Sequence, residues 1–152
     1  MTNYRMKAPS ILFLLAMVIG FVTSEECTAQ TCRVNSGVNA DGQISYMEVF
    51  EYDFVEEKPM FPGGGTELVN FINKNRRYPA EAYSMGIEGR VTCSFVVNND
   101  GTISHIGIIR GVEPSLNKEA VRIISKMPHW SPGKIEGNAV PVRVICAIPF
   151  RK

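Results

Sequence analysis

The sequence predicts a two-layer α+β domain in which a three-stranded antiparallel sheet, of strand order 2-1-3, is covered by helices on one face. Two observations lead to this fold class. An alternating apolar pattern at 91–97 is followed by a turn at 98–101 and a second apolar run at 102–110. An amphipathic segment at 114–126 then precedes a third alternating run at 140–150. Because a helix connects the second strand to the third, these two strands run parallel to each other. The first strand then lies between them and is antiparallel to both.

Shorter elements are predicted ahead of this unit. Residues 30–43, rich in Asn, Gly and Ser, predict a linker, and aromatic and acidic residues alternate in 48–58, which predicts a short strand or an extended arm. Thr66 is a candidate N-cap for a short helix. Pro79 can open another helix, and Gly86 can close it.

The first 29 residues are predicted to be a secretory signal peptide. A basic start precedes twelve uncharged residues at 11–22, whereas a helix that spans a bilayer needs about 20 apolar residues. We expect cleavage after Ala29, which gives a periplasmic or secreted protein; an uncleaved anchor in the inner membrane is the alternative. The predicted organisation is then a leader at 1–29, a linker and arm at 30–58, and a domain at 59–152.

Composition and charge exclude several classes of function. The net charge is +1, from 16 basic and 15 acidic residues, so the basic face that nucleic-acid binding requires is not expected. Two His and four Cys give little material for a zinc site. The sequence contains no nucleophile elbow and no phosphate-binding loop. We therefore expect no catalytic residue, no metal, no cofactor and no small-molecule substrate.

Two alternatives remain open at this point. Residues 37–48 match much of a calcium-binding loop, but Gly37 stands where the first carboxylate ligand belongs, so a simple turn is preferred. A secreted ion-binding or enzymatic protein that uses the acidic stretch 41–57 is the corresponding alternative function. Cys93 and Cys146 both lie in apolar strand patterns; buried free thiols are preferred there, and a disulfide between them is the alternative.

An ordered series of residues in the second half of the chain resembles a known family. The series comprises Tyr78-Pro79, Ala82, Gly86-Ile87-Glu88-Gly89, Val91, Cys93, Phe95, Val97, Asp100-Gly101, Gly111, Leu116, Glu119-Ala120, Trp130, Pro132-Gly133, Val140 and Val142. It is similar to the C-terminal domain of TonB, the energy-transducing protein of Gram-negative envelopes, over about residues 60–152. The resemblance implies a periplasmic domain that binds the TonB box, a short peptide at the N-terminus of outer-membrane transporters, by adding it as a strand beside the last strand.

The resemblance also implies roles for particular residues. Contacts with the partner are expected at Arg76, Arg77, Tyr78 and Pro79. Structural roles are expected for Gly86, Gly89, Asp100, Gly101, Trp130, Pro132 and Gly133. Energy transduction in this family further requires an inner-membrane helix and a Pro-rich spacer, and this sequence contains no such spacer. A released domain that binds without transducing energy is therefore an alternative, and a homodimer formed by strand exchange is left open.

Two prolines in the last strand give a separate prediction of the binding edge. Pro141 and Pro149 are both odd-numbered, and alternate residues of a strand direct their backbone groups to the same side. Because proline lacks an N–H group, it is tolerated only toward an unpaired edge. Arg143, Ile145 and Ala147 are therefore predicted to present free N–H and C=O groups to an added peptide strand.

Overall fold

The computed structural model describes residues 30–38 and 40–152, and the predicted leader lies outside them. In chain order the elements are β1 (Thr31–Val38), β2 (Ile44–Glu51), the 3-10 turn η1 (Tyr52–Phe54), α1 (Gly64–Asn75), α2 (Ala80–Ser84), β3 (Gly89–Val97), β4 (Ile103–Arg110), α3 (Pro114–Ser125), β5 (Gly133–Ile135), β6 (Asn138–Val140) and β7 (Val142–Phe150). Among the described residues, no helix has the length and apolar character needed to cross a membrane.

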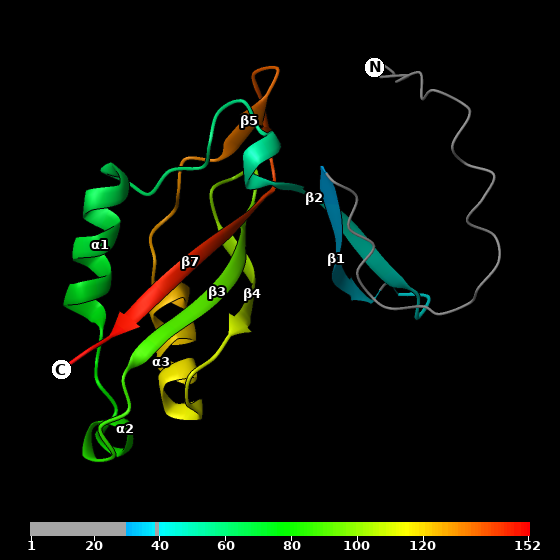
Figure 1. The fold of residues 1–152 in the computed structure, drawn as a ribbon. Helices are drawn as coiled ribbons and strands as arrows, with labels where there is room; N and C mark the ends of the chain where they lie inside the picture. The colour runs from blue at the N-terminus through cyan, green and yellow to red at the C-terminus, as the bar shows by residue number, and fades with distance from the viewer. Residues whose placement is uncertain (1–29, 39) are drawn as a thin grey trace.

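The main sheet contains the predicted three strands and two more. Within the described part of the chain, five strands follow the order β1-β2-β7-β3-β4 (Figure 1). β3 is antiparallel to both β4 and β7, which is the predicted 2-1-3 arrangement. The prediction of a purely antiparallel three-stranded sheet is nevertheless wrong, because β2 joins the edge of β7 in parallel and brings β1 with it. β5 and β6 form a separate hairpin that the sequence analysis missed.

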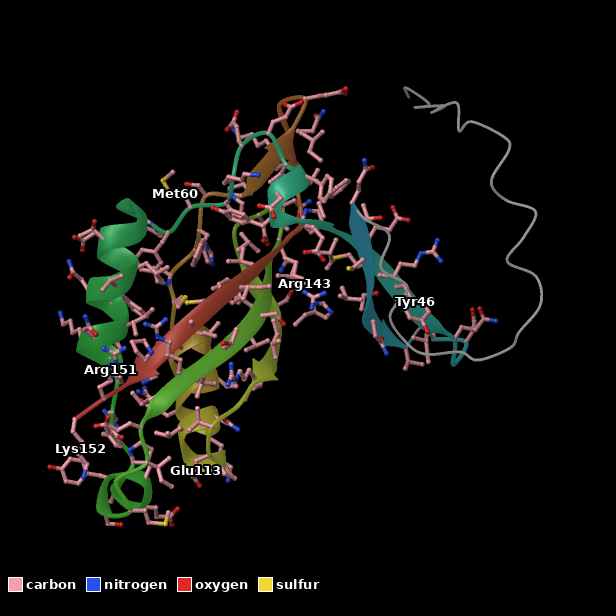
Figure 2. The ribbon with its side chains drawn as sticks, in the orientation of Figure 1. Tyr46, Met60, Glu113, Arg143, Arg151 and Lys152 are labelled. Carbon is pink, nitrogen blue, oxygen red and sulfur yellow. The ribbon has the colours of Figure 1, made fainter. Side chains whose placement is uncertain are left out.

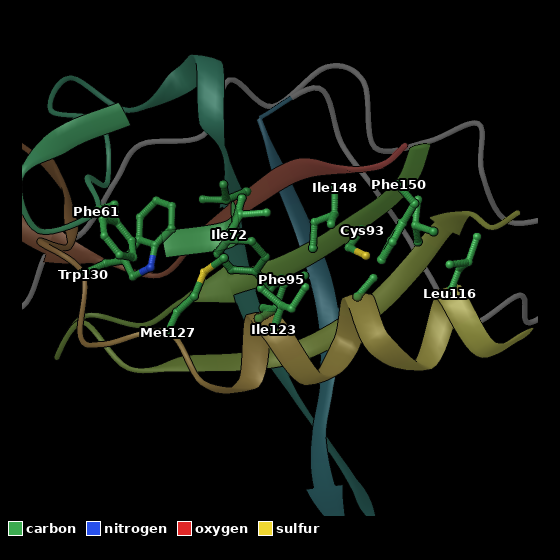
Figure 3. Packing of buried hydrophobic residues seen from close by; sticks show 14 of the residues in the cluster. Phe61, Ile72, Cys93, Phe95, Leu116, Ile123, Met127, Trp130, Ile148 and Phe150 are labelled. Atoms are coloured by element: carbon green, nitrogen blue, oxygen red, sulfur yellow. The ribbon is translucent and has the colours of Figure 1, made fainter. Parts of the chain in front are cut away.

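The helices pack against one face of β3 and β7. Burial alternates along β7, and its even-numbered side chains face inward as predicted. Ile72 of α1 and Ile123 of α3 belong to the same buried cluster as Phe95 of β3, so both helices lie on the same side of the sheet. Figure 3 shows this core, which includes Phe61, Ile72, Cys93, Phe95, Leu116, Ile123, Met127, Trp130, Ile148 and Phe150.

The segment predicted to be a linker is a β-hairpin. Cys32 on β1 faces Val49 on β2, and both side chains are buried, whereas the residues between these positions and the turn are mostly exposed. The described Asn, Gly and Ser residues of this segment occupy exposed positions, and the abundance of these residue types led to the prediction of a linker instead of a strand. The calcium-loop candidate at 37–48 forms the far end of the hairpin, and the strand expected in 48–58 ends at Glu51.

The helix ends agree with the sequence signals in part. α1 begins at Gly64 after a left-handed Gly63, so Thr66 is not its N-cap. α2 follows Pro79, and Gly86 ends it with a φ of 65°. α3 is capped by Glu113, whose carboxylate accepts the N–H of Ser115 at 2.8 Å. That acidic cap is favourable beside the positive end of the helix dipole.

Cys93 and Cys146 lie opposite each other on β3 and β7 and are free thiols. Burial raises the pKa of Cys93 to about 11, with a smaller contribution from Cys146. Burial also raises the pKa of Cys146. The preferred prediction of free thiols is therefore confirmed; Cys93 is buried as expected, whereas Cys146 is half-buried.

Glu119 is a buried carboxylate that fastens α3 to the segment after α1. It accepts the backbone N–H of Arg77 at 2.8 Å and Nε of Arg122 at 2.7 Å. Arg122 in turn donates to the carbonyl of Asn75 at 2.6 Å. Burial alone would raise the pKa of Glu119, but the hydrogen bonds and charges of Arg122 and Arg77 outweigh it and hold this pKa below its usual value.

We expect Glu119→Gln to lower the free energy of unfolding by about 1–3 kcal/mol at neutral pH, because it removes charge-assisted hydrogen bonds. A carboxyl whose pKa is depressed in the folded state contributes stability above its unfolded pKa and loses it as pH falls through the folded pKa. As pH falls below 4.5, the unfolding free energy of the parent should therefore decrease more steeply than that of Glu119→Gln. The difference between the two slopes should be at most about 1.4 kcal/mol per pH unit. Urea denaturation of both proteins across this range measures the difference, and parallel curves would contradict the prediction.

Candidate functional site

The outer edge of β7 carries the backbone groups of its odd-numbered residues. Pro149 lies opposite Arg90 of β3, and since proline cannot donate, this pair and every second pair along the ladder are the ones without hydrogen bonds. The carbonyls of Pro141 and Pro149 point away from β3. The first accepts the N–H of Phe50 at 2.9 Å, and the second accepts the Arg76 guanidinium.

The chain itself covers both ends of this edge. At one end β2 runs parallel to β7, with Glu51 beside Arg143 and a distance of 3.6 Å between their charged groups. At the other end lies Arg76. The prediction of an exposed edge at Arg143 is therefore corrected, because β2 pairs there. Ile145 and Ala147 lie between the two ends, have exposed side chains and pair only with β3 among the described strands.

A cavity of about 690 Å³ opens beside the uncovered stretch. Its walls come from four parts of the chain: β7 at Arg143–Ile145, residues within the segment 51–61, the start of α1 through Leu68, and Trp130. The lining residues place this groove between the start of α1 and the first residues of β7; Figure 1 shows the two elements converging toward the C-terminal end of β7. Of the uncovered stretch, Ile145 lines this groove.

The groove walls are apolar and carry balanced charge. Ile145 and Met60 are 58% and 56% exposed, which is high for large apolar side chains at the mouth of a groove. Met60 lies near the start of α1 (Figure 2). Two hydrogen bonds with Ser131, of 3.0 and 2.8 Å, hold its backbone in place. The charged lining residues are two acids and two bases, namely Glu51, Asp53, Lys58 and Arg143. The groove therefore suits an extended segment with apolar side chains and little net charge.

The predicted partner contacts Arg76, Arg77, Tyr78 and Pro79 connect α1 to α2. Tyr78 has a structural role, because its hydroxyl donates to the carbonyl of Ile87 and its ring packs edge-on against Phe150. Arg77 has an exposed side chain on a backbone held by Glu119. The structure thus brings Arg76 to the edge of β7 and leaves Arg77 directed toward solvent.

Six of the predicted structural residues do not line the groove, namely Gly86, Gly89, Asp100, Gly101, Pro132 and Gly133. The seventh, Trp130, does line it. Hydrogen bonds from the hydroxyl and backbone of Thr102 hold the pKa of Asp100 below its usual range. A Cβ on Gly133 would lie 2.5 Å from Cγ2 of Val142, which accounts for glycine at that position.

A family model described as Gram-negative bacterial TonB protein C-terminal matches residues 74–151, more than half of the chain. The chain belongs to this family. The TonB C-terminal match spans β3, β4, α3 and β7, so the candidate edge lies inside it. β1, β2 and nearly all of α1 lie before it. Strand β2 and the α1 side of the groove are therefore features of this chain outside the matched region.

The chain is also similar to curated proteins and to solved structures from Helicobacter pylori. Protein TonB of Helicobacter pylori strain J99 is 36% identical over 62 residues, which is 40% of this chain and 22% of that protein, and TonB of strain 26695 gives the same values. The chain thus spans about a fifth of the length of these curated relatives. The NMR solution structure of the Helicobacter pylori TonB-CTD is 27% identical, with a TM-score of 0.45, over 57% of this chain and 90% of that one.

Sequence reasoning missed the groove residues Glu51, Met60 and Leu68. Each of the three is distant from β7 in the sequence, and no local sequence pattern indicates that they lie beside the edge of β7. The nearest available signal was the pair of prolines around Met60, which interrupts regular structure between β2 and α1.

Proposed function

We propose that this TonB C-terminal domain binds an extended peptide as an added strand on the β7 edge at Ile145 and Ala147. In this way it would engage TonB-box-like segments of outer-membrane transporters and support energy-coupled transport. The observation that carries the proposal is the uncovered stretch of β7 beside an apolar groove. Strand addition gains affinity from main-chain hydrogen bonds and specificity from pockets for alternate side chains. The uncovered stretch of β7 would supply the first, and the apolar groove would supply the second.

Several further features belong to this proposal. The domain acts in the periplasm, either released from its leader or held at the inner membrane, and it binds rather than catalyses. Arg77 is a second contact with the transporter, since its side chain is exposed and it directly follows Arg76, which reaches the edge. The alternative of an ion-binding protein has less support, because the described residues contain no group of three or more His, Cys, Asp or Glu placed to hold a metal ion.

Ile145→Pro is expected to abolish peptide binding while leaving the fold intact. The N–H that it removes points to the outer edge and takes no part in the β3–β7 ladder. The measurement is titration of the isotope-labelled domain with synthetic peptides copied from the N-terminal segments of outer-membrane transporters. In the parent, the amide signals of Ile145 and Ala147 should shift on binding.

Ile145→Thr is the matched control, because it changes the same side chain but keeps the N–H group. It should retain binding within about threefold if the backbone supplies most of the affinity. Peptide binding by Ile145→Pro that equals the parent's would overturn the proposed edge. Equal losses in both variants would assign the affinity to the side chain instead.

A further inference from the structure

The chain's own strand β2 already occupies part of the proposed peptide edge. Phe50 pairs with Val142 and Glu51 with Arg143, and the pairing ends there. The N–H of Phe50 donates to the carbonyl of Pro141 at 2.9 Å. Directly after Glu51 the chain turns away from β7 into the 3-10 turn at 52–54, which lines the groove.

The contact between β2 and β7 is small, and its backbone hydrogen bond is separate from those that hold the hairpin together, while the side chains of Glu51 and Arg143 also contact Cys32 of β1 at 3.0 and 3.7 Å. The N–H of Glu51 donates to the carbonyl of Gln30 at 3.1 Å, on the β1 side, whereas that of Phe50 points to β7. The hairpin is held by strand pairing along the whole length of β1 and β2, and the side chain of Val49 is buried. It also reaches β4, where a ring nitrogen of His105 lies 2.7 Å from the carbonyl oxygen of Asn35. The end of β2 can therefore leave β7 while the rest of the hairpin stays attached.

We propose that β2 is a built-in competitor for the peptide edge, a regulatory role that rests on the proposed function of that edge. With β2 in place, an added strand can pair only with Ile145 and Ala147. A longer strand that also pairs beside Arg143 must displace Phe50 and Glu51, and it must replace the ion pair between Glu51 and Arg143. The apparent dissociation constant of such a strand equals the intrinsic one divided by the fraction of molecules in which β2 has withdrawn.

The sequence of β2 supplies a probe for this competition. The probe is a fluorescein-labelled synthetic copy of residues 46–52, and its binding to the full chain is followed by fluorescence anisotropy. Phe50→Pro removes the N–H group that donates to Pro141 and keeps the N–H groups of β2 that face β1. This variant should therefore bind the probe at least about tenfold more tightly than the parent does. Phe50→Ala loses the same ring but keeps the N–H, and its affinity should change by less than about threefold.

A milder variant and a double variant complete the experiment. Glu51→Gln keeps the size of the side chain and removes the charge that faces Arg143 and Cys32. It should strengthen binding by about two- to fourfold, which tests the competition even where Phe50→Pro folds poorly. Ile145→Pro added to Phe50→Pro should abolish binding. Unchanged affinity in Phe50→Pro and Glu51→Gln, with binding that still depends on Ile145, would overturn the competition and leave the proposed edge standing. Binding that ignores Ile145→Pro, or no binding by any variant, would overturn both.

Discussion

Replacement of Trp130 by alanine is expected to lower the free energy of unfolding by about 3–5 kcal/mol. The side chain is 6% exposed and lies where the segment after α3 crosses the core. Its ring meets Phe61 edge-on at a centroid distance of 5.7 Å and Phe95 at 5.4 Å. Removing it leaves a cavity between Phe61, before α1, and Phe95 of β3 (Figure 3). Equilibrium urea denaturation measures the loss.

Trp130→Phe separates packing from hydrogen bonding in this effect. The indole Nε1 is buried and has no hydrogen-bond partner among the described residues. Phenylalanine therefore removes volume but breaks no hydrogen bond, and the expected loss is below about 2 kcal/mol. An alanine variant with the denaturation midpoint of the parent would refute the assignment of Trp130 to the core. A phenylalanine variant as unstable as the alanine variant would show that Nε1 has a partner in solution.

The parts of the fold that the sequence predicted are those fixed by neighbours in the chain. The alternation along β3, the turn before β4 and the apolar stripe of α3 are local patterns, and each produced the expected element. The turn illustrates why: the N–H of Gly101 donates to the carbonyl of Asn98, four residues are enough to form it, and no distant contact is needed.

The missed parts depend on pairing between distant residues. β1 has few apolar residues, and it becomes a strand because Cys32 and Val49 are buried against each other across the hairpin. The last strand starts at Val142 rather than Val140, because Val140 pairs with Gly133 in the β5–β6 hairpin. Neither partner can be chosen from local alternation alone.

The candidate site shows the same division. Which side of β7 faces outward followed from Pro141 and Pro149, since the absence of an N–H group is a covalent property of the residue itself. How much of that side stays uncovered did not follow, because Arg143 is covered by β2 and the carbonyl of Pro149 by Arg76. Both covering groups come from segments more than sixty residues earlier in the chain.

Gly101→Ala is expected to destabilise the protein through two separable costs. The backbone of Gly101 has a φ of 83°, and the left-handed region costs a residue with a Cβ about 1–2 kcal/mol. The second cost is a collision, because that Cβ would lie 2.2 Å from the carbonyl oxygen of Trp130. That oxygen belongs to the backbone, and the Trp130 N–H donates to the carbonyl of Gly101 at 2.9 Å, so the two segments are held together and cannot separate cheaply.

Gly137→Ala isolates the first cost from the second. Gly137 has a φ of 77°, almost the same as Gly101, but an added Cβ would meet nothing within 4 Å. We expect Gly137→Ala to lower the free energy of unfolding by about 1–2 kcal/mol and Gly101→Ala to lower it by about 3 kcal/mol or more. Urea denaturation of the two variants beside the parent gives both values, and their difference measures the close approach between the β3–β4 turn and Trp130. Equal losses would mean that this approach opens at little cost, and the turn would then be fastened to the core less tightly than the hydrogen bond between Trp130 and Gly101 indicates.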